Sequence, residues 1–302
     1  MGHQLEQIQK ELFQLHNGNQ MKLYPVYPGI NLSFLTLKSD QITLHHDALS
    51  QVLEINYCKS GRIGWNMANG NTVYLGPGDY SLHTMDTCAD SLITLPNGTY
   101  EGFTLFIHLD LLAGIPLEFL TDTGITGTFL CNKFCKNGTF SSFGGNAETE
   151  SIFSGFYNQP QSIQLAYWKI KIAELLLYLG KKQVSATHQL TAYRSEQIEV
   201  VRKIHEQLTQ HMEQRFTIDS LAKEYLMNPT TLKTVFKAVY GNSLAAHIKE
   251  HRMEKAAELL RGTQENITVI SKKVGYENQS KFTSAFKEYF QMLPTQYRKK
   301  YS

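Results

Sequence analysis

The 302-residue sequence predicts an α+β fold with two domains, an antiparallel β sandwich or barrel followed by an all-α domain. Short apolar runs separated by turn residues fill the region from about residue 22 to residue 112, a pattern typical of antiparallel β structure. From residue 195 onward the apolar spacing is helical. We therefore expect an N-terminal domain at 1–180, a polar aperiodic linker at 181–194 and a C-terminal domain at 195–302.

Charge is divided unevenly along the chain. Residues 196–302 hold 17 Lys and Arg against 12 Asp and Glu, whereas residues 1–195 hold 12 against 15. A basic C-terminal part favours a polyanionic partner. No apolar run approaches the ~18 residues that a membrane span needs, and residues 1–20 are polar without a secretory signal, so we expect no membrane association. Four scattered cysteines predict a reduced, cytoplasmic protein.

The N-terminal domain is predicted element by element from its apolar periodicity. Residues 1–17 carry Leu5, Ile8, Leu12 and Leu15 at helical spacing. The clearest strand patterns lie at 51–58, 62–67, 71–75, 80–85 and 101–109. Residues 113–160 give no clear pattern. Residues 163–179 predict a strongly apolar helix through Leu165, Trp168, Ile172, Leu175, Leu176 and Leu179. This helix either packs across the barrel or forms a homodimer interface, and its apolar character favours the interface.

Residues 217–301 contain the same two-helix unit twice. In the first copy the turn at Met227-Asn228-Pro229 separates two helices, with Asn228 expected as N-cap and Pro229 at the first helical position. In the second copy the turn lies at 275–278. Helical spacing predicts that the second helix of each copy buries one apolar face, formed by Leu232, Val235, Phe236 and Val239 in the first and by Phe282, Ala285, Phe286 and Tyr289 in the second.

The opposite faces of these second helices are polar and indicate DNA binding. They carry Thr230, Thr231, Lys233, Thr234 and Lys237 in the first copy, and Gln279, Ser280, Lys281, Thr283 and Ser284 in the second. Either face alone is more typical of a solvated helical bundle. A helix predicted at 243–261 separates the copies by roughly 28 Å, however, near the ~34 Å between successive major grooves. This spacing favours two recognition helices that read adjacent grooves.

Residues 216–298 contain the segments TIDSLAKEYLMNPTTLKTVFKAVYGNSL, HIKEHRMEKAAELL, ITVISKKVGYENQSKFTSAFKEYF and LPTQYRK. Through these segments the stretch resembles the DNA-binding domain of the AraC/XylS transcriptional regulators. The resemblance implies base-reading roles for Thr230, Lys233 and Thr234 in the first unit and for Gln279, Ser280 and Ser284 in the second. Gln291 and Leu293 depart from the family pattern, which usually has Gly and then Ser or Thr.

The resemblance also implies an architecture and partners for the whole chain. Members of this length often carry an N-terminal cupin-like barrel that binds a small-molecule effector, followed by helices that dimerise. We therefore expect a cytoplasmic regulator, an activator rather than a repressor, that binds tandem half-sites on double-stranded DNA as a homodimer and contacts RNA polymerase. Residues 53–65 and 74–83 are similar to a subgroup that includes siderophore-responsive regulators, and the effector itself is not identified by the sequence.

Effector contacts are predicted at Glu54, Asn56, Trp65, Tyr80 and His83. Glu54 and Asn56 share one face of their strand, opposite Leu53, Ile55 and Tyr57, and the sequence leaves open which face lines the barrel. For Trp65, a purely structural place in the core is an equal alternative.

Neither a metal nor a cofactor is predicted for the N-terminal domain. His45-His46, His83 and His108 show no metal-ligand spacing, and Cys131 and Cys135 fit unrelated thiols better than a metal or redox pair.

Two other classes of function are alternatives to the regulator. A DNA-tethered enzyme would be a repair methyl acceptor or a metal-dependent barrel, but the cysteines are too dispersed for the zinc cluster of a methyl acceptor. An architectural DNA-binding protein would need no effector. The sequence therefore favours a regulator that is not an enzyme.

Overall fold

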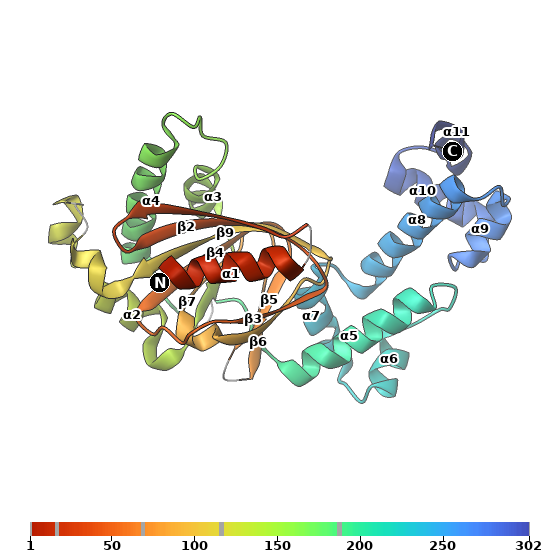
Figure 1. The fold of residues 1–302 in the computed structure, drawn as a ribbon. Helices are drawn as coiled ribbons and strands as arrows, with labels where there is room; N and C mark the ends of the chain where they lie inside the picture. Colours follow the sequence, from red (N-terminus) through yellow and green to blue (C-terminus); the bar gives the residue numbers. More distant parts are fainter. Residues whose placement is uncertain (1, 16–17, 68–69, 115–117, 186–188, 302) are drawn as a thin grey trace. The chain divides into compact units, whose positions relative to one another are not determined.

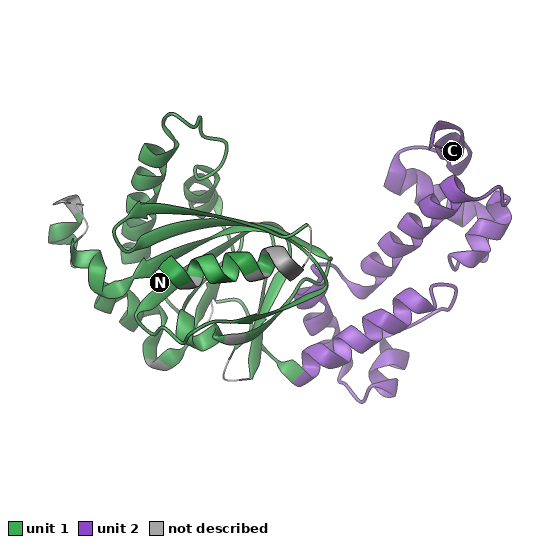
Figure 2. Ribbon diagram, viewed as in Figure 1, with its two compact units in different colours: residues 1–195 green, residues 196–302 purple. Residues whose placement is uncertain are grey.

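The structure is a computed structural model that describes residues 2–15, 18–67, 70–114, 118–185 and 189–301. The chain divides into two compact units, unit 1 at Met1–Ser195 and unit 2 at Glu196–Ser302 (Figure 2). Unit 1 is built on antiparallel sheets and unit 2 is helical, as the predicted α+β class requires (Figure 1). Among the described helices, none is long and apolar enough to cross a bilayer.

Two antiparallel sheets form the centre of unit 1. The first has the strand order β1-β2-β9-β4-β7-β10 and the second has the order β11-β6-β5-β8-β3, so the strands lie in two sheets rather than in one closed barrel. Their bounds are β1 Gln20–Tyr27, β2 Ile30–Lys38, β3 Gln41–His45, β4 Val52–Gly61, β5 Ile63–Asn66, β6 Asn71–Leu75, β7 Tyr80–Thr84, β8 Asp90–Thr94, β9 Thr99–His108, β10 Ser141–Phe143 and β11 Tyr193–Arg194.

Helices complete unit 1 on both sides of the six-stranded sheet. One apolar core lies between that sheet and the helices that follow it in sequence, and the other lies between the two sheets and α1. The bounds are α1 Gly2–Leu15, α2 Gly127–Phe134, α3 Ala147–Ser154 and α4 Gln164–Lys181, with short 3-10 turns η1 Met85–Cys88, η2 Leu109–Gly114, η3 Glu118–Thr123 and η4 Lys136–Gly138.

The central strand β4 shows how one sequence serves both cores. Leu53, Ile55 and Tyr57 belong to the core under the helices, and Glu54 and Asn56 point to the space between the sheets. Side chains alternate across a strand, so the two sets must face opposite sides. The sequence did not decide which face of this strand lines the space between the sheets; in the structure it is the face that carries Glu54 and Asn56.

The apolar helix α4 packs within its own unit. Trp168, Ile172 and Leu176 are buried against the six-stranded sheet, and so are Leu175 and Leu179. These residues were expected to favour a homodimer interface, and that interpretation is wrong for them because the sheet already covers them. Leu165, the remaining residue of the predicted apolar set, is exposed.

The amphipathic helix at the N-terminus and the region 181–194 are both tied to the sheets. Leu5, Ile8 and Leu12 are buried in the inter-sheet core, as predicted, while the side chain of Leu15 lies outside the described residues. Strand β11 pairs with β6, and the backbone N–H of Leu190 donates to the carbonyl of Ser142 at 2.8 Å. The described C-terminal part of the stretch 181–194 thus pairs with unit 1, while residues 186–188 lie outside the described residues.

Unit 2 consists of helices that include two short-helix, turn, long-helix pairs. Figure 1 shows α8 running between the two pairs. The bounds are α5 Ser195–Gln210, α6 Ile218–Glu224, α7 Pro229–Tyr240, α8 Leu244–Gly262, α9 Ile267–Lys273, α10 Gln279–Phe290 and α11 Pro294–Tyr301. The predicted apolar face of α7 is buried throughout. On α10, Phe282 and Phe286 are buried, but Tyr289 is 39% exposed, so its predicted burial is wrong.

Candidate nucleic-acid interface and effector cavity

The two long helices of the repeat begin in the same way. The Asn228 side chain accepts hydrogen bonds from the backbone N–H groups of Thr230 and Thr231, at 2.9 and 3.3 Å. The Asn278 side chain does the same for Ser280 and Lys281, at 2.7 and 3.4 Å. Such caps satisfy backbone N–H groups that have no partner within the helix, and each contributes about 1 kcal/mol. Both helix starts are thereby fixed with polar side chains on the first turn.

The turns inside the two pairs are also equivalent. The N–H of Met227 donates to the carbonyl of Ala222, and the N–H of Tyr276 donates to that of Ser271, both at 2.9 Å. This bond spans five residues and closes a Schellman turn, which needs a left-handed residue just before it. Gly275 fills that position in the second pair with φ 78°, and Leu226 fills it in the first with φ 52°.

The predicted DNA-reading residues lie mostly on the outer faces of α7 and α10. Thr231 and Thr283 are half-buried. The hydroxyl of Thr234 donates to the carbonyl of Thr230 at 2.9 Å, and Gln279 Oε1 accepts from the hydroxyl of Thr268 at 2.5 Å. The sequence did not indicate that these two side chains are already engaged. Thr230, Lys233, Thr234, Lys237, Gln279, Ser280, Lys281 and Ser284 are exposed.

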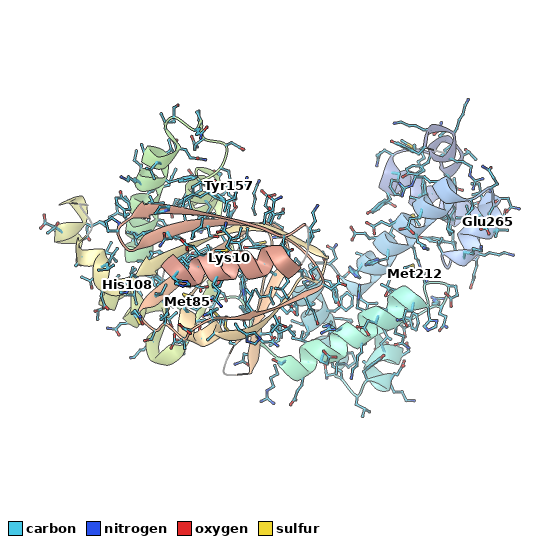
Figure 3. All side chains as sticks on the ribbon, viewed as in Figure 1. Lys10, Met85, His108, Tyr157, Met212 and Glu265 are labelled. Carbon is cyan, nitrogen blue, oxygen red and sulfur yellow. The ribbon has the colours of Figure 1, made fainter. Side chains whose placement is uncertain are left out.

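Helix α8 carries the side chains that connect the two pairs. Arg252 donates from Nε to the carbonyl of Met212 at 3.0 Å and from a terminal guanidinium nitrogen to that of Gln214 at 2.8 Å (Met212 is labelled in Figure 3). Its guanidinium carbon also lies 5.9 Å from the ring centre of Tyr276, in the turn of the second pair. Arg252 therefore links the segment before the first pair to the turn of the second.

An apolar cavity of about 60 Å³ lies between the sheets of unit 1. Ile8 and Leu12 of α1 form part of its wall, and Glu54, Asn56 and Thr104 supply polar groups. The Thr104 hydroxyl donates to Asn56 Oδ1 at 2.6 Å, whereas the buried Asn56 Nδ2 has no hydrogen-bond partner in the described part of the chain. A buried donor without a partner costs stability, so Asn56 offers a hydrogen bond to a molecule that enters.

The structure brings three of the five predicted effector residues to this cavity. Glu54, Asn56 and Trp65 line it, and Trp65 also belongs to the surrounding core. Fully buried His83 lies behind the wall, with Nε2 3.3 Å from Glu54 Oε2. Tyr80 was wrongly placed: its hydroxyl lies 3.0 Å from that of Tyr178 on α4, in the other core. Positions 80 and 83 differ by an odd number, so one strand cannot point both side chains to the same face.

Sequence reasoning missed a second group at the same cavity. Ligand atoms of His46, Glu54 and Cys88 lie within 4.8 Å of one another, although His46 shows no metal-ligand spacing in the sequence. His46 directly follows β3, Glu54 lies in β4, and Cys88 is the last residue of the 3-10 turn η1. No local spacing connects them, so only the sheet topology could have shown their proximity.

Taken together, the repeated caps, the repeated Schellman turns and the exposed polar faces define unit 2 as a double helix-turn-helix domain. Residues 221–300 match the family model described as a helix-turn-helix domain. The resemblance of the C-terminal unit to the DNA-binding domain of the AraC/XylS regulators is thereby confirmed.

Several of the relatives that this chain matches are named as transcriptional regulators. The chain is 35% identical over 86 residues to the HTH-type transcriptional regulator AlkR of Acinetobacter baylyi, which is 28% of each chain. It is 31% identical over 134 residues to the virulence regulon transcriptional activator VirF of Yersinia enterocolitica, 43% of this chain and 48% of that one. The C-terminal domain of AraT, a response regulator from Geobacillus stearothermophilus, is a similar solved structure with 35% identity and a TM-score of 0.33, covering 33% of this chain and 84% of that one.

Proposed function

We propose that the protein is a transcriptional regulator that binds double-stranded DNA through α7 and α10. The observation that carries this proposal is a repeat: α7 before α8 and α10 after it each begin at an Asn cap and expose a polar outer face. Short hydroxyl and amide side chains near a helix N-terminus suit contact with base edges in the major groove, and Lys suits phosphate contact. A spacer of 19 residues, roughly 28 Å long, supports binding to tandem half-sites one helical turn apart.

Unit 1 is proposed to sense a small, largely apolar effector in the inter-sheet cavity. The apolar lining and the free amide donor of Asn56 favour a molecule with an apolar body and a hydrogen-bond acceptor. A volume of about 60 Å³ is well below the ~300 Å³ of ordinary ligand pockets. Binding would therefore move part of the cavity wall. Ile8 and Leu12 belong to α1, an α-helix outside both sheets. Displacement of α1 is the structural response that we propose for effector binding.

A homodimer in the cytoplasm, acting as an activator that contacts RNA polymerase, completes the proposal. For the dimer contact, the residues of interest are on the outer face of α4. Tyr167, Ile170 and Leu177 are exposed there, at spacings of three and seven residues, which place them on one side of the helix, and the exposed Ile163 is the N-cap residue just before it. An exposed apolar stripe of this kind suits a second copy of the same helix.

The test of DNA recognition compares single substitutions on the two outer faces. Lys233→Ala and Gln279→Ala should each weaken binding to the promoter that the protein occupies in its host by about tenfold or more, because a base contact contributes roughly 1–3 kcal/mol. Binding to random DNA should change much less. Lys10→Ala, which removes the same charge from an exposed position on α1, should bind like wild type. Electrophoretic mobility titration measures all four proteins on both DNAs, and equal losses on the two DNAs would contradict base reading.

A further inference from the structure

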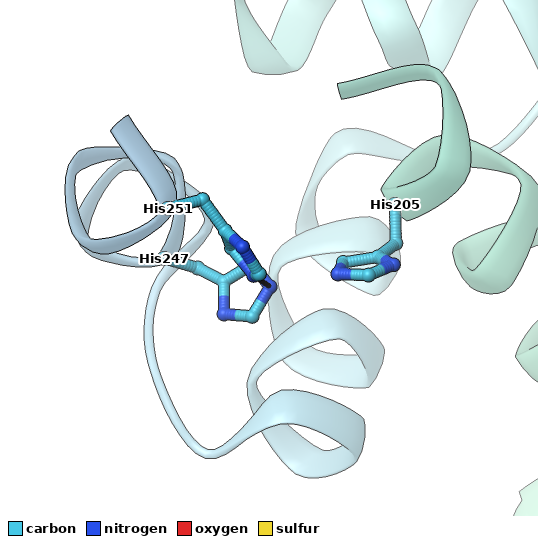
Figure 4. Close-up of side chains that lie close together, drawn as sticks. All are labelled: His205, His247 and His251. Atoms are coloured by element: carbon cyan, nitrogen blue, oxygen red, sulfur yellow. Dashed lines mark hydrogen bonds between the residues drawn. The ribbon is translucent and has the colours of Figure 1, made fainter. Parts of the chain in front are cut away.

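Three histidines from two helices of unit 2 converge on one point. His247 and His251 are four residues apart on α8, so both rings project from the same side of that helix, and His205 faces them from α5 (Figure 4). Nε2 of His247 lies 3.0 Å from Nε2 of His251, and one ligand nitrogen from each of the three rings lies within 4.8 Å of the others.

The geometry points to a binding site for a divalent transition-metal ion of the zinc class, held by His205, His247 and His251. Two histidines at positions i and i+4 on one helix are a recurrent metal-binding pair, because their imidazoles can reach the same ion. A tetrahedral ion with Zn–N bonds of ~2.0–2.1 Å separates its ligand nitrogens by roughly 3.4 Å. The observed separations extend from 3.0 Å to within 4.8 Å, so small ring rotations complete the site.

The donor set selects the class of ion. Imidazole nitrogens suit Zn²⁺, Co²⁺, Ni²⁺ and Cu²⁺, whereas Mg²⁺ and Ca²⁺ require oxygen ligands. Three protein ligands leave one coordination position of a tetrahedral ion open. His247 is buried, while His205 and His251 are half-buried, so the ion can reach the site from the partly exposed side.

The surroundings favour a metal site over an incidental contact of rings. The His247 ring packs against Phe236 and Tyr240, and the His205 ring stacks on Tyr240 at 4.4 Å and 17°. These aromatic contacts limit the ring positions before any ion binds, which lowers the entropy cost of assembling the site. Two Nε2 atoms 3.0 Å apart can share only one proton in a hydrogen bond, whereas a metal ion engages the lone pairs of both.

The bound ion would join elements on either side of the first helix-turn-helix pair. His205 lies on α5, before α6 and α7, and the other two ligands lie on α8, after them. A metal bridge would restrict the movement of α5 relative to α8, the two helices that flank the first helix-turn-helix pair in the sequence. Metal binding to the folded form alone should therefore raise the unfolding temperature of unit 2.

The experiment uses full-length protein without a polyhistidine tag, treated with a chelator and then titrated with Zn²⁺ by calorimetry. Wild type should bind one more Zn²⁺ per chain than His251→Gln, and thermal unfolding of unit 2 should shift upward by about 10 °C with Zn²⁺ at a hundredfold excess over its Kd. Titration with Co²⁺ should give visible absorption bands that His251→Gln lacks. His205→Gln should behave like His251→Gln, which guards against a folding defect in one variant.

Two control variants separate this site from other histidines. His211→Gln removes an exposed histidine of the same unit, and His46→Gln removes a member of the group at the unit 1 cavity. Both should keep the Zn²⁺ that His251→Gln loses. The proposal is overturned if His251→Gln and His205→Gln bind as many Zn²⁺ ions as wild type with equal affinity, in which case the three rings form only an aromatic cluster. Equal Co²⁺ spectra for wild type and His251→Gln would overturn it as well.

Discussion

At the scale of single residues, the equivalent turns of the repeat show where the first copy is strained. Leu226 and Gly275 occupy the same left-handed position, but a left-handed backbone costs a residue with a Cβ roughly 1–2 kcal/mol. Leu226 is also 95% exposed, so its side chain recovers little by packing. A Cβ at Gly275 would lie 2.4 Å from the carbonyl oxygen of Met212, which explains the glycine in the second copy.

Leu226→Gly should therefore stabilise unit 2, and Gly275→Ala should destabilise it. We expect a gain of about 1 kcal/mol for the first change, which corresponds to a rise of about 4 °C in its Tm. The second change combines left-handed strain with a backbone clash and should cost roughly 2 kcal/mol or more. Differential scanning calorimetry measures both. A loss of stability in Leu226→Gly would show that the exposed leucine has a role that the turn geometry does not explain.

Cys58 gives a pH dependence at the same scale. Burial, with a smaller contribution from Asp79, raises the pKa of its thiol from 9.0 to about 12, although Arg62 opposes the shift. Between these values the unfolded chain loses the thiol proton and the folded chain keeps it. Stability is therefore fully present below pH 9 and falls as the pH rises toward 12, by at most about 1.4 kcal/mol per pH unit for this thiol. Chemical denaturation at several alkaline pH values should show a shallower fall for Cys58→Ala; parallel curves would contradict the assignment.

At the scale of elements, the apolar side of α4 that the sequence proposed as a dimer interface differs from the side that is exposed. The apolar side of this helix covers the sheet, while the exposed stripe includes Ile170 at 64% exposure. A substitution at Leu176 would disturb the core and would not test a dimer contact, because that residue is fully buried. The apolar periodicity predicted a helix. It did not show that α4 carries apolar residues on two sides, one buried against the sheet and one exposed.

Substitution on the exposed stripe tests dimer formation without touching the core. Ile170→Asp should convert a dimer into a monomer, because a charge in an apolar contact between two copies loses its solvation. Light scattering after gel filtration measures the mass. Leu226→Asp makes the same kind of change at a fully exposed position in unit 2 and should stay dimeric. An unchanged mass for folded Ile170→Asp would place any dimer contact elsewhere.

Local signals predicted the helical elements well. Asn228 and Pro229 marked the start of α7 because capping depends on neighbours in the chain, and the burial of Leu232, Val235, Phe236 and Val239 followed from helical spacing. The cavity residues were harder. Tyr80 was misplaced although strand alternation already excluded its pairing with His83, whereas the approach of His46 to Cys88 depends on how distant strands pair.

At the scale of the whole molecule, the predicted α+β class and the helical C-terminal unit are confirmed, while the barrel is two sheets. The clustering of His205 with His247 and His251 could not be predicted from the sequence, because His205 and His247 are 42 positions apart and only the packing of α5 against α8 brings them together. The sequence contained the i, i+4 pair, which could have raised the question of a metal. The third ligand required the structure.

The central claim is that the two helix-turn-helix pairs read adjacent major grooves, and hydroxyl-radical footprinting on the occupied promoter tests it most directly. Wild type should protect two windows about 10 base pairs apart on one face of the duplex. Lys233→Ala should weaken protection chiefly in one window, and Gln279→Ala chiefly in the other. A single protected window in wild type, or equal weakening of both windows by each substitution, would contradict the claim.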